Sequence, residues 1–312
     1  MDAVAIFPGQ GSQAVGMLAE LAAAHKTVRA TFDEASAALG EDLWSLVAEG
    51  PVERLDQTRW TQPAMLAADI AVWRVYRALG GATPLAMAGH SLGEYAALVA
   101  ADAIAFDDAV RVVHRRGSVM QAAVAEGEGA MAAILGLEDA QVERICADHP
   151  GAVAANYNSP GQLVIAGSRA AVEAAAAQCL EAGARRALLL PVSVPAHSPL
   201  MAAAEVGLRE ALDAVELRAP RIEVLHNADL RAHAEPDAIR SALVRQLTHP
   251  VPWTRTIQVL LERGAGRFLE CGPGRVLCGL GRRIQRDAEW LALESGPGLI
   301  AALGHPETET QS

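Results

Sequence analysis

The fold of this chain is decided by the stretch Pro84-Leu-Ala-Met-Ala-Gly-His-Ser-Leu-Gly-Glu-Tyr-Ala-Ala-Leu98. Its apolar start predicts a buried strand, the segment Gly89-His-Ser-Leu-Gly93 predicts a sharp turn, and its alanine-rich end predicts a helix. The two glycines let the backbone turn tightly, which leaves Ser91 exposed above the edge of the sheet. A helix that begins just after Ser91 points the positive end of its dipole at the hydroxyl. The stretch therefore predicts a nucleophile elbow; the alternative is a glycine-flanked serine in an ordinary tight turn.

The composition is that of a large globular protein. Its 312 residues, 51% of them hydrophobic, allow either two average domains or one large α/β domain with an insertion. The formal charge of −11 disfavours nucleic acid as the main partner. No uncharged apolar run is long enough to cross a bilayer, and the N-terminus lacks the basic region of a signal peptide, so we expect a cytoplasmic protein. The four cysteines form no C-x-x-C pair, which favours small buried thiols over a metal site or disulfides.

The elements expected after residue 128 have the order of a ferredoxin-like unit, β-α-β-β-α-β. Strands are expected at residues 130–135, 153–157, 162–166 and 187–192, and helices at 138–147 and 169–183. We therefore predict an α/β fold in two parts. Residues 1–127 and 196–312 are expected to form an α/β-hydrolase-like large domain with a parallel sheet, and residues 128–195 a ferredoxin-like small domain inserted in it.

The large domain is expected to combine a few strands with many helices. Strands are predicted at residues 3–7 and 222–227, with the last strand at 267–271. Helices are predicted from residue 15, over 27–39, 43–48, 62–79, 106–125, 201–214, 237–247 and 253–264, and after 272–274. The polar tail after Leu303 is expected to be disordered.

The loop after the first strand matches a loose dinucleotide-binding pattern, Gly9-x-Gly11-x-x-Ala14, with Asp33 at about the expected distance. That pattern requires the acid at the end of a second strand, whereas Asp33 lies in a segment with helical spacing. No Lys-Ser or Lys-Thr follows the glycines, as a P-loop would require. We therefore reject nucleotide binding by this loop. Its glycines would instead let the Gln10 N–H approach Ser91 and, with the Leu92 N–H, form an oxyanion hole.

A serine hydroxyl needs a base to accept its proton, and histidine titrates in the right range. His197 is the preferred candidate, because it lies in a proline-stiffened loop at the junction of the two predicted domains, where a cleft is expected. The alternative is a partly buried polar residue in a loop. His90 follows the elbow glycine, but a turn neighbour usually points elsewhere. Surface positions are expected for His25, His149, His233, His249 and His305, whereas His114 and His226 could be surface or buried.

No acid stands at an obvious strand end to orient this imidazole. In α/β-hydrolases an Asp or Glu lies between the serine and the histidine in the chain, but here that interval is mostly the insert. A backbone or amide carbonyl could orient the ring, which suits acyl transfer to a thiol better than hydrolysis. Arg116 lies on a predicted helix, where an arginine usually points to solvent. Near the nucleophile it would instead bind a carboxylate through two parallel hydrogen bonds.

Seven motifs together resemble the malonyl-CoA:acyl-carrier-protein transacylases. They are Phe7-Pro-Gly-Gln-Gly-Ser-Gln13, Gly89-His-Ser-Leu-Gly-Glu94, Arg116-Gly117 with Met120-Gln121, Asn158-Ser-Pro-Gly-Gln162, Val194-Pro-Ala-His197, Arg245-Gln-Leu247 and Gly272-Pro-Gly274. The resemblance runs from the N-terminus to about Arg283, and the order of elements also fits that family.

The resemblance implies ping-pong transfer of malonyl from malonyl-CoA to the phosphopantetheine thiol of acyl carrier protein, for fatty-acid synthesis. It implies no resident cofactor or metal, no membrane or nucleic-acid partner, and a monomer. Leu92 after the serine fits malonyl better than methylmalonyl within the family. The implied roles are a malonyl ester on Ser91, a general base and acid at His197, a carboxylate partner at Arg116, an oxyanion hole from the Gln10 and Leu92 N–H groups, and support of His197 by a carbonyl of Gln246.

Carrier proteins of this kind are acidic, so an acidic enzyme must present a local basic face to them. We expect this face at Arg185-Arg186 and Arg282-Arg283-x-x-Arg286; the alternative is a solvated helix surface. Three other functions remain open: a serine esterase or thioesterase, a non-catalytic subunit that binds a carrier protein, and a related acyltransferase that serves a decarboxylase or a polyketide system.

Overall fold

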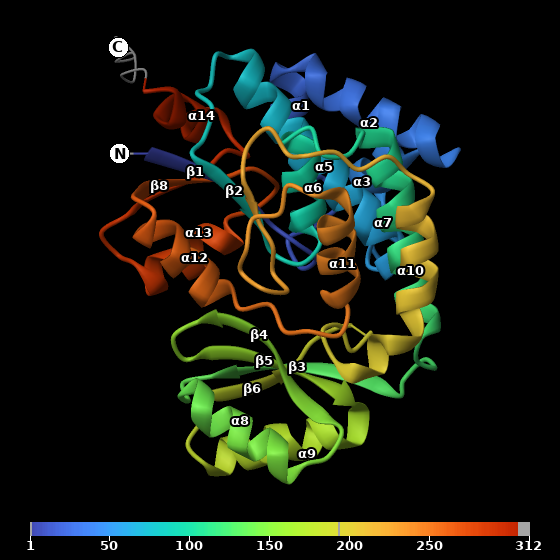
Figure 1. Ribbon diagram of the computed structural model, residues 1–312, viewed down its shortest axis with the longest axis vertical. Coiled ribbons are helices and arrows are strands. Elements are labelled where there is room, and N and C mark those ends of the chain that lie inside the picture. Colours follow the sequence, from blue (N-terminus) through green and yellow to red (C-terminus); the bar gives the residue numbers. More distant parts are fainter. Residues whose placement is uncertain (1, 193, 305–312) are drawn as a thin grey trace.

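The computed structural model describes residues 2–192 and 194–304, and they contain two separate β-sheets (Figure 1). The larger sheet has five strands in the order β7-β2-β1-β8-β9, and every neighbouring pair is parallel. The strands are β1 (Asp2–Phe7), β2 (Ala86–Gly89), β7 (Val224–Leu225), β8 (Ala265–Glu270) and β9 (Glu289–Ala292). Because the strands are parallel, the loops that follow them meet at one edge of the sheet.

Helices cover both faces of this sheet, which explains why β1 is apolar from Ala3 to Phe7. Successive side chains point to opposite faces, so Phe7 joins one apolar core and Ile6 the other. The first core includes residues of α2 (Lys26–Leu39), α5 (Thr58–Ala78), α6 (Gly93–Ala100), α7 (Phe106–Ala122), α10 (Ala204–Asp213) and α11 (Pro236–Arg245), and of the shorter α1 (Ala19–Ala24), α3 (Leu43–Glu49), α4 (Val52–Leu55) and α14 (Gly296–Leu303). The second core includes residues of α12 (Trp253–Glu262) and α13 (Val276–Ile284).

The smaller sheet is antiparallel, with the order β4-β5-β3-β6. Its elements are β3 (Gly129–Leu135), α8 (Asp139–Asp148), β4 (Ala152–Ser159), β5 (Gln162–Ser168), α9 (Arg169–Glu181) and β6 (Arg186–Leu189). Both helices lie on the side of this sheet that faces away from the large sheet (Figure 1). The predicted fold class, an α/β-hydrolase-like part with a parallel sheet and an inserted ferredoxin-like unit, is confirmed. The domain limits at residues 128 and 195 stay a prediction.

The two faces of the small sheet bury different side chains. Ala132 and Ile134 of β3 pack with α8 and α9, whereas Met131 and Val164 form a separate small cluster on the opposite face. This alternation follows from the period of two along a strand. The helix-free face therefore presents apolar side chains toward the large sheet, where a substrate cavity can form.

Several predicted element limits were wrong. The strand at 265–270 is not the last, because β9 follows it and packs Trp290 on Phe268 with ring centroids 4.2 Å apart. The strand expected at 222–227 has only two residues, and the helix expected from residue 15 begins at Ala19. The helix expected at 201–214 begins as a short 3-10 helix, Pro199–Ala203. Arg286 lies beyond α13, which ends at Ile284. The tail expected to be disordered lies, except for Gly304, outside the described residues.

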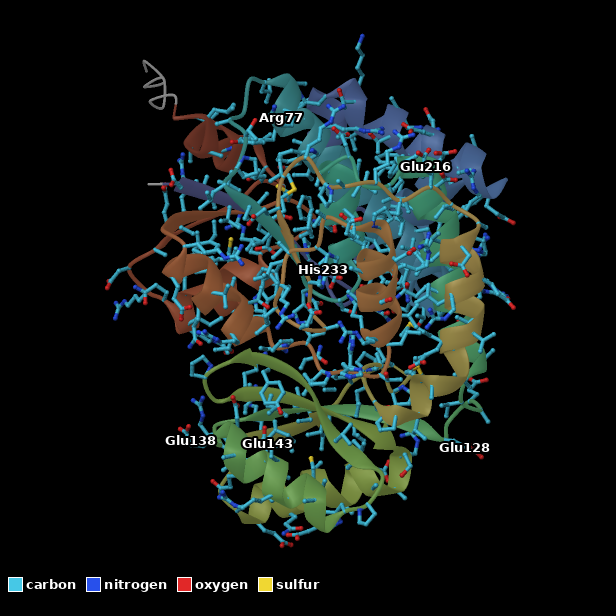
Figure 2. All side chains as sticks on the ribbon, in the orientation of Figure 1. Arg77, Glu128, Glu138, Glu143, Glu216 and His233 are labelled. Carbon is cyan, nitrogen blue, oxygen red and sulfur yellow. The ribbon has the colours of Figure 1, made fainter. Side chains whose placement is uncertain are left out.

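The negative charge of the chain is spread over outer surfaces. Figure 2 labels exposed glutamates on both parts of the molecule, with Glu138 and Glu143 on the helical side of the small unit and Glu216 on the large one. Over residues 2–192 and 194–304, no helix combines the length and apolarity that a membrane span requires.

Candidate active site

Ser91 lies in the turn between β2 and α6, at the carboxyl edge of the large sheet. Its φ of 52° is in the left-handed region, which a serine adopts only at a cost and which neighbouring contacts must hold. One such contact is the hydrogen bond from the Ser91 N–H to Asn227 Oδ1, at 2.8 Å. Gly93 allows the turn to approach β1, because a Cβ there would lie 2.1 Å from the Phe7 carbonyl oxygen. The elbow predicted from the sequence is therefore present in the structure.

The Ser91 Oγ lies 2.8 Å from His197 Nε2. The other ring nitrogen of His197, Nδ1, lies 2.8 Å from the Gln246 carbonyl oxygen and 3.2 Å from that of His249. Carbonyl oxygens only accept hydrogen bonds, so Nδ1 carries the proton and Nε2 presents its lone pair to the serine hydroxyl. This is the tautomer that can accept a proton from Ser91.

The imidazole of His197 is held in its neutral form. The side chain is 2% exposed, and burial, followed by the charge of Arg116, lowers the pKa of His197 to about 3. A base that is neutral at physiological pH is ready to accept the Ser91 proton. The two carbonyls take the place of the acid that was missing from the sequence, as expected for an imidazole oriented by a carbonyl.

Arg116 reaches the same point from α7, and it is 2% exposed. Its Nη2 donates to Ser91 Oγ at 3.3 Å and to Gln246 Oε1 at 2.9 Å, and its Nη1 donates to Gln62 Oε1 at 2.9 Å. The Tyr95 ring lies 5.5 Å below the guanidinium carbon. Among the described residues, no carboxylate forms an ion pair with Arg116. The arginine therefore does not point to solvent but places an unneutralised charge beside the nucleophile.

The backbone N–H groups of Gln10 and Leu92 flank the same space. Both residues line the cavity that contains Ser91. Within the described part of the chain, neither N–H donates a hydrogen bond to another protein group. The loop of Gln10 packs against the elbow, since a Cβ on Gly9 would lie 2.5 Å from the His90 carbonyl oxygen. Both N–H groups are therefore free to donate to a molecule bound in this cavity.

These groups surround a cavity of about 190 Å³ between the two sheets. Ser91, Arg116 and His197 form its polar end. Its walls are otherwise mostly apolar and come from the small sheet, the segment after β6 and α13: Met131, Val164, Leu190, Val192, Val194, Val276, Leu277 and Leu280. Such a cavity suits a small acyl group on an extended, mostly uncharged arm.

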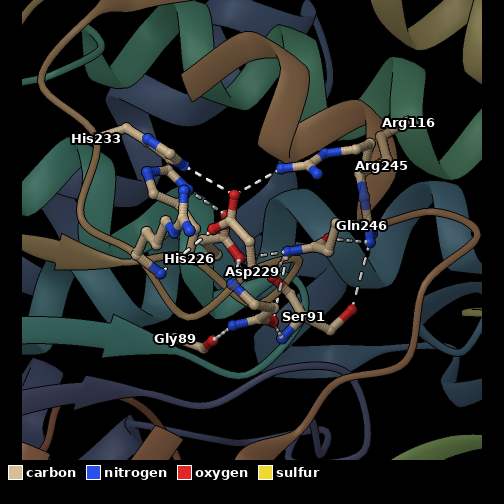
Figure 3. A network of polar contacts seen from close by, with 11 residues as sticks. Gly89, Ser91, Arg116, His226, Asp229, His233, Arg245 and Gln246 are labelled. Carbon is tan, nitrogen blue, oxygen red and sulfur yellow. Dashed lines mark hydrogen bonds and ion pairs between the residues drawn. The ribbon is translucent and has the colours of Figure 1, made fainter. Parts of the chain in front are cut away.

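A second polar layer lies behind the elbow, and of its residues only Gln246 was expected at the site. Asn227 accepts from the Ser91 N–H and donates to the Gly89 carbonyl at 2.8 Å, while Glu94 accepts from His226 Nδ1 at 2.7 Å. Gln246 bonds both Ser91 and Arg116, through its Nε2 and its Oε1 respectively (Figure 3). The sequence does hold a signal for part of this layer, because the pair His226-Asn227 directly follows a strand of the parallel sheet. Gln62, within a helix of apolar spacing, had no such signal.

The remaining histidines differ partly from expectation. His226 is fully buried, and His90 lines the cavity and bonds Asn158 Oδ1 of β4 through Nε2 at 2.9 Å. Burial lowers the pKa of His90, so it bridges the elbow and the small sheet as a neutral ring. His25, His149 and His233, expected at the surface, are half-buried, His249 is exposed, and His305 lies outside the described residues.

Comparisons with known proteins identify the family of this chain. The chain matches the model of the acyl transferase domain over residues 4–290. It is 52% identical over 301 residues to the malonyl CoA-acyl carrier protein transacylase of Escherichia coli strain K12, covering 96% of this chain and 97% of that relative. The solved transacylase of Coxiella burnetii superposes with a TM-score of 0.96 at 48% identity, over 97% of each chain. A malonyl-transacylase solved with a type II PKS acyl-carrier protein superposes with a TM-score of 0.95 at 49% identity, over 97% of this chain and 99% of that one. The chain therefore belongs to the malonyl-CoA:acyl-carrier-protein transacylase family of acyl transferase domains.

Proposed function

We propose that this chain transfers malonyl from malonyl-CoA to the phosphopantetheine thiol of an acyl carrier protein, through a malonyl ester on Ser91. One observation carries the proposal: the Ser91 hydroxyl lies 2.8 Å from the His197 base and 3.3 Å from the Arg116 guanidinium. A nucleophile and base alone would suit many acyl groups. A buried cation beside them favours an acyl group that carries its own carboxylate, as malonyl does.

In the first half-reaction, the Ser91 Oγ forms a bond to the thioester carbonyl carbon while its proton moves to His197 Nε2. The N–H groups of Gln10 and Leu92 stabilise the negative charge on the carbonyl oxygen. Collapse of this intermediate breaks the carbon–sulfur bond, and the leaving CoA sulfur takes the proton from His197. In the second half-reaction, His197 takes the proton of the carrier thiol while the sulfur forms a bond to the ester carbonyl carbon. The bond from this carbon to Ser91 Oγ then breaks, and His197 returns the proton to Oγ. Neither step requires a metal or a resident cofactor.

The partners of His197 favour transfer to a thiol over hydrolysis. A carbonyl stabilises the charged imidazolium less than a carboxylate would, so His197 is a weak base in this site. A thiol has a pKa of about 8.5 and gives up its proton far more readily than water, so a weak base suffices for it. This difference favours the transferase over the esterase or thioesterase.

A basic depression at the edge of the small sheet is our proposed carrier-docking surface. It is lined by Arg185, Arg186 and Arg283 around Gly161, and Arg283 also contacts Gln162. All three arginines are exposed, and within residues 2–192 and 194–304 none forms an ion pair. Of the other expected basic residues, Arg282 instead donates to the Trp290 carbonyl.

The setting we propose is malonyl supply for fatty-acid synthesis in the cytoplasm. All four cysteines are free and buried, which suits a reducing compartment. A polyketide carrier is the second candidate, because the similar transacylase solved in complex with a carrier binds one from a type II PKS. Rates measured with a panel of carrier proteins would distinguish the two settings.

Incubation with malonyl-CoA is expected to add one malonyl group to Ser91, because the ester is an obligatory intermediate. Mass spectrometry of the intact protein and of its peptides checks this. Ser91→Ala should abolish the adduct, whereas Ser12→Ala, in the same cavity, should retain it. A folded protein that forms no adduct would contradict the mechanism. Hydrolysis of malonyl-CoA as fast as transfer to a carrier protein would indicate a thioesterase. Activity retained in Ser91→Ala would indicate that the serine has no catalytic role.

Arg116→Ala is expected to lower malonyl transfer far more than acetyl transfer. Loss of a charged, desolvated pair with the malonyl carboxylate should cost about 2–5 kcal/mol in kcat/KM, whereas acetyl has no such carboxylate. Arg116→Lys keeps the charge without the two parallel donors, so it should lose less. Steady-state kinetics with both acyl-CoA substrates measure the difference. Equal losses for the two substrates would reject the clamp.

The pH dependence of Ser91 acylation should show no loss near the ordinary pKa of histidine. The pKa of His197 is lowered to about 3, so the neutral base persists on acidification and kcat/KM should stay nearly constant between about pH 8 and 5. The unfolded chain binds this proton more tightly, so stability falls as pH drops from about 6.5 toward 3. Circular dichroism at each pH therefore accompanies the rates. A half-maximal rate near pH 6.5 in folded protein would show that burial does not control this base.

Charge reversal in the basic depression is expected to weaken carrier binding. Replacing both Arg186 and Arg283 by Glu should raise KM for the carrier protein by about tenfold at low salt, and less at high salt. The matched control is Arg209→Glu, an exposed arginine on α10. Acylation of Ser91 by malonyl-CoA, measured separately, shows that the site is intact. An unchanged carrier KM would place the docking surface elsewhere.

A further inference from the structure

We propose that Glu94 is a positioning residue for acyl selection, acting through the amide of Gln246 on the guanidinium of Arg116. The inference rests on the proposed function, because it concerns how the enzyme prefers malonyl to uncharged acyl groups. Glu94 itself does not face the cavity and touches no reacting atom.

The carboxylate of Glu94 is fully buried and holds three donors. Its Oε1 accepts from His226 Nδ1 at 2.7 Å, and its Oε2 accepts from the Asn227 N–H at 2.9 Å and from Gln246 Nε2 at 2.8 Å. Burial of a carboxylate is costly unless such donors surround it. The three donors come from the loop after β7 and from the end of α11, so the carboxylate joins segments that are remote in the chain.

The carboxylate decides which way the Gln246 amide points. A glutamine amide has one accepting end and one donating end, whereas a carboxylate only accepts. The NH2 end of Gln246 must therefore face Glu94, where it also donates to the Ser91 carbonyl oxygen at 3.0 Å. The oxygen end is left to accept from Arg116 Nη2 at 2.9 Å (Figure 3). The opposite orientation would place the Gln246 NH2 group against the Arg116 guanidinium, and the Gln246 oxygen against the Glu94 carboxylate.

An amide between the two charges has an advantage over direct contact. A carboxylate paired directly with Arg116 would compete with the carboxylate of the substrate for the same donors. Gln246 instead fixes the guanidinium through a neutral oxygen, while the nearby charge of Glu94 still favours the protonated arginine against the burial that lowers its pKa. The guanidinium is thereby oriented but not neutralised.

The test is Glu94→Gln, which keeps the size of the side chain but replaces an acceptor by a donor. His226 Nδ1, the Asn227 N–H and the Gln246 NH2 group then compete for one oxygen, and the new NH2 group faces one of these donors. Rotation of the Gln246 amide relieves this conflict but turns its NH2 group toward Arg116. We expect both acyl-CoA substrates to react more slowly, because Gln246 also bonds Ser91. In addition, the ratio of malonyl to acetyl kcat/KM should fall by about tenfold relative to the wild-type enzyme, which is the effect of losing one charge-assisted hydrogen bond.

A second variant, Glu94→Asp, separates this positioning role from a purely structural role of Glu94. Glu94→Asp keeps the accepting carboxylate but leaves a gap, so packing alone would make it more harmful than Glu94→Gln. We expect Glu94→Asp to be less stable to heat yet to retain more of the malonyl preference. The matched control is Glu270→Gln, which also loses a fully buried carboxylate, one that accepts from the N–H groups of Leu277 and Cys278. It should leave the substrate ratio unchanged.

Gln246→Met supplies a second route, because it removes the amide at similar length. Its malonyl-to-acetyl ratio should fall as far as that of Glu94→Gln, and the double variant should fall no further. A full additional loss in the double variant, or an unchanged ratio in folded Glu94→Gln, would overturn the inference. Should Glu94→Gln not fold, an unchanged ratio in Gln246→Met would overturn it. Malonylation of wild-type Ser91 is measured alongside, so failure of the proposed function is distinguished from failure of this inference.

Discussion

The hydrogen bond between Ser91 and His197 joins residues 106 positions apart, and the rest of the site depends on it. Both residues have a left-handed backbone, with φ of 52° and 61°. Each such residue costs about 1–3 kcal/mol and persists only when its surroundings hold it. Asn227 accepts from the Ser91 N–H, and the Leu247 carbonyl accepts from the His197 N–H at 3.0 Å. The loops after β7 and α11 thus maintain a strained pair that neither local sequence would adopt by itself.

The second constraint is the burial of charge. Arg116, Glu94 and the neutral His197 lie together in a region with almost no solvent exposure. In such a low-dielectric environment an unpaired polar group is costly, and neutral amide and carbonyl groups supply most of the hydrogen bonds to Arg116 and His197. Gln62 and Gln246 hold the guanidinium, and carbonyls hold the imidazole. The charges therefore stay available to a substrate instead of neutralising one another.

The small sheet completes the site without contributing a proposed reacting group. Its helix-free face supplies Met131 and Val164 to the cavity wall, and Asn158 bonds His90 beside the nucleophile. An apolar wall limits the access of water to the malonyl ester. The same unit carries Arg185 and Arg186, so one insertion both covers the ester and lines the proposed docking surface.

Local sequence determined the elbow, because glycines, an apolar strand and a helix within fifteen residues leave the backbone one compatible arrangement. It also determined the ferredoxin-like unit, whose order of elements is characteristic. Strand β9 was not predicted, because four residues after a charged turn have the pattern of a loop. The stacking of Trp290 on Phe268, which holds this strand, is a tertiary contact that local sequence does not show. The family resemblance predicted which residues surround Ser91, namely Gln10, Leu92, Arg116, His197 and Gln246. The local sequence pattern alone indicated only some of these residues. Their distances, the partners of Glu94 and the second carbonyl at the imidazole, that of His249, were decided by the tertiary structure alone. The physical reason is that parallel strands bring the ends of distant segments to one edge, where an unpaired buried polar group is costly.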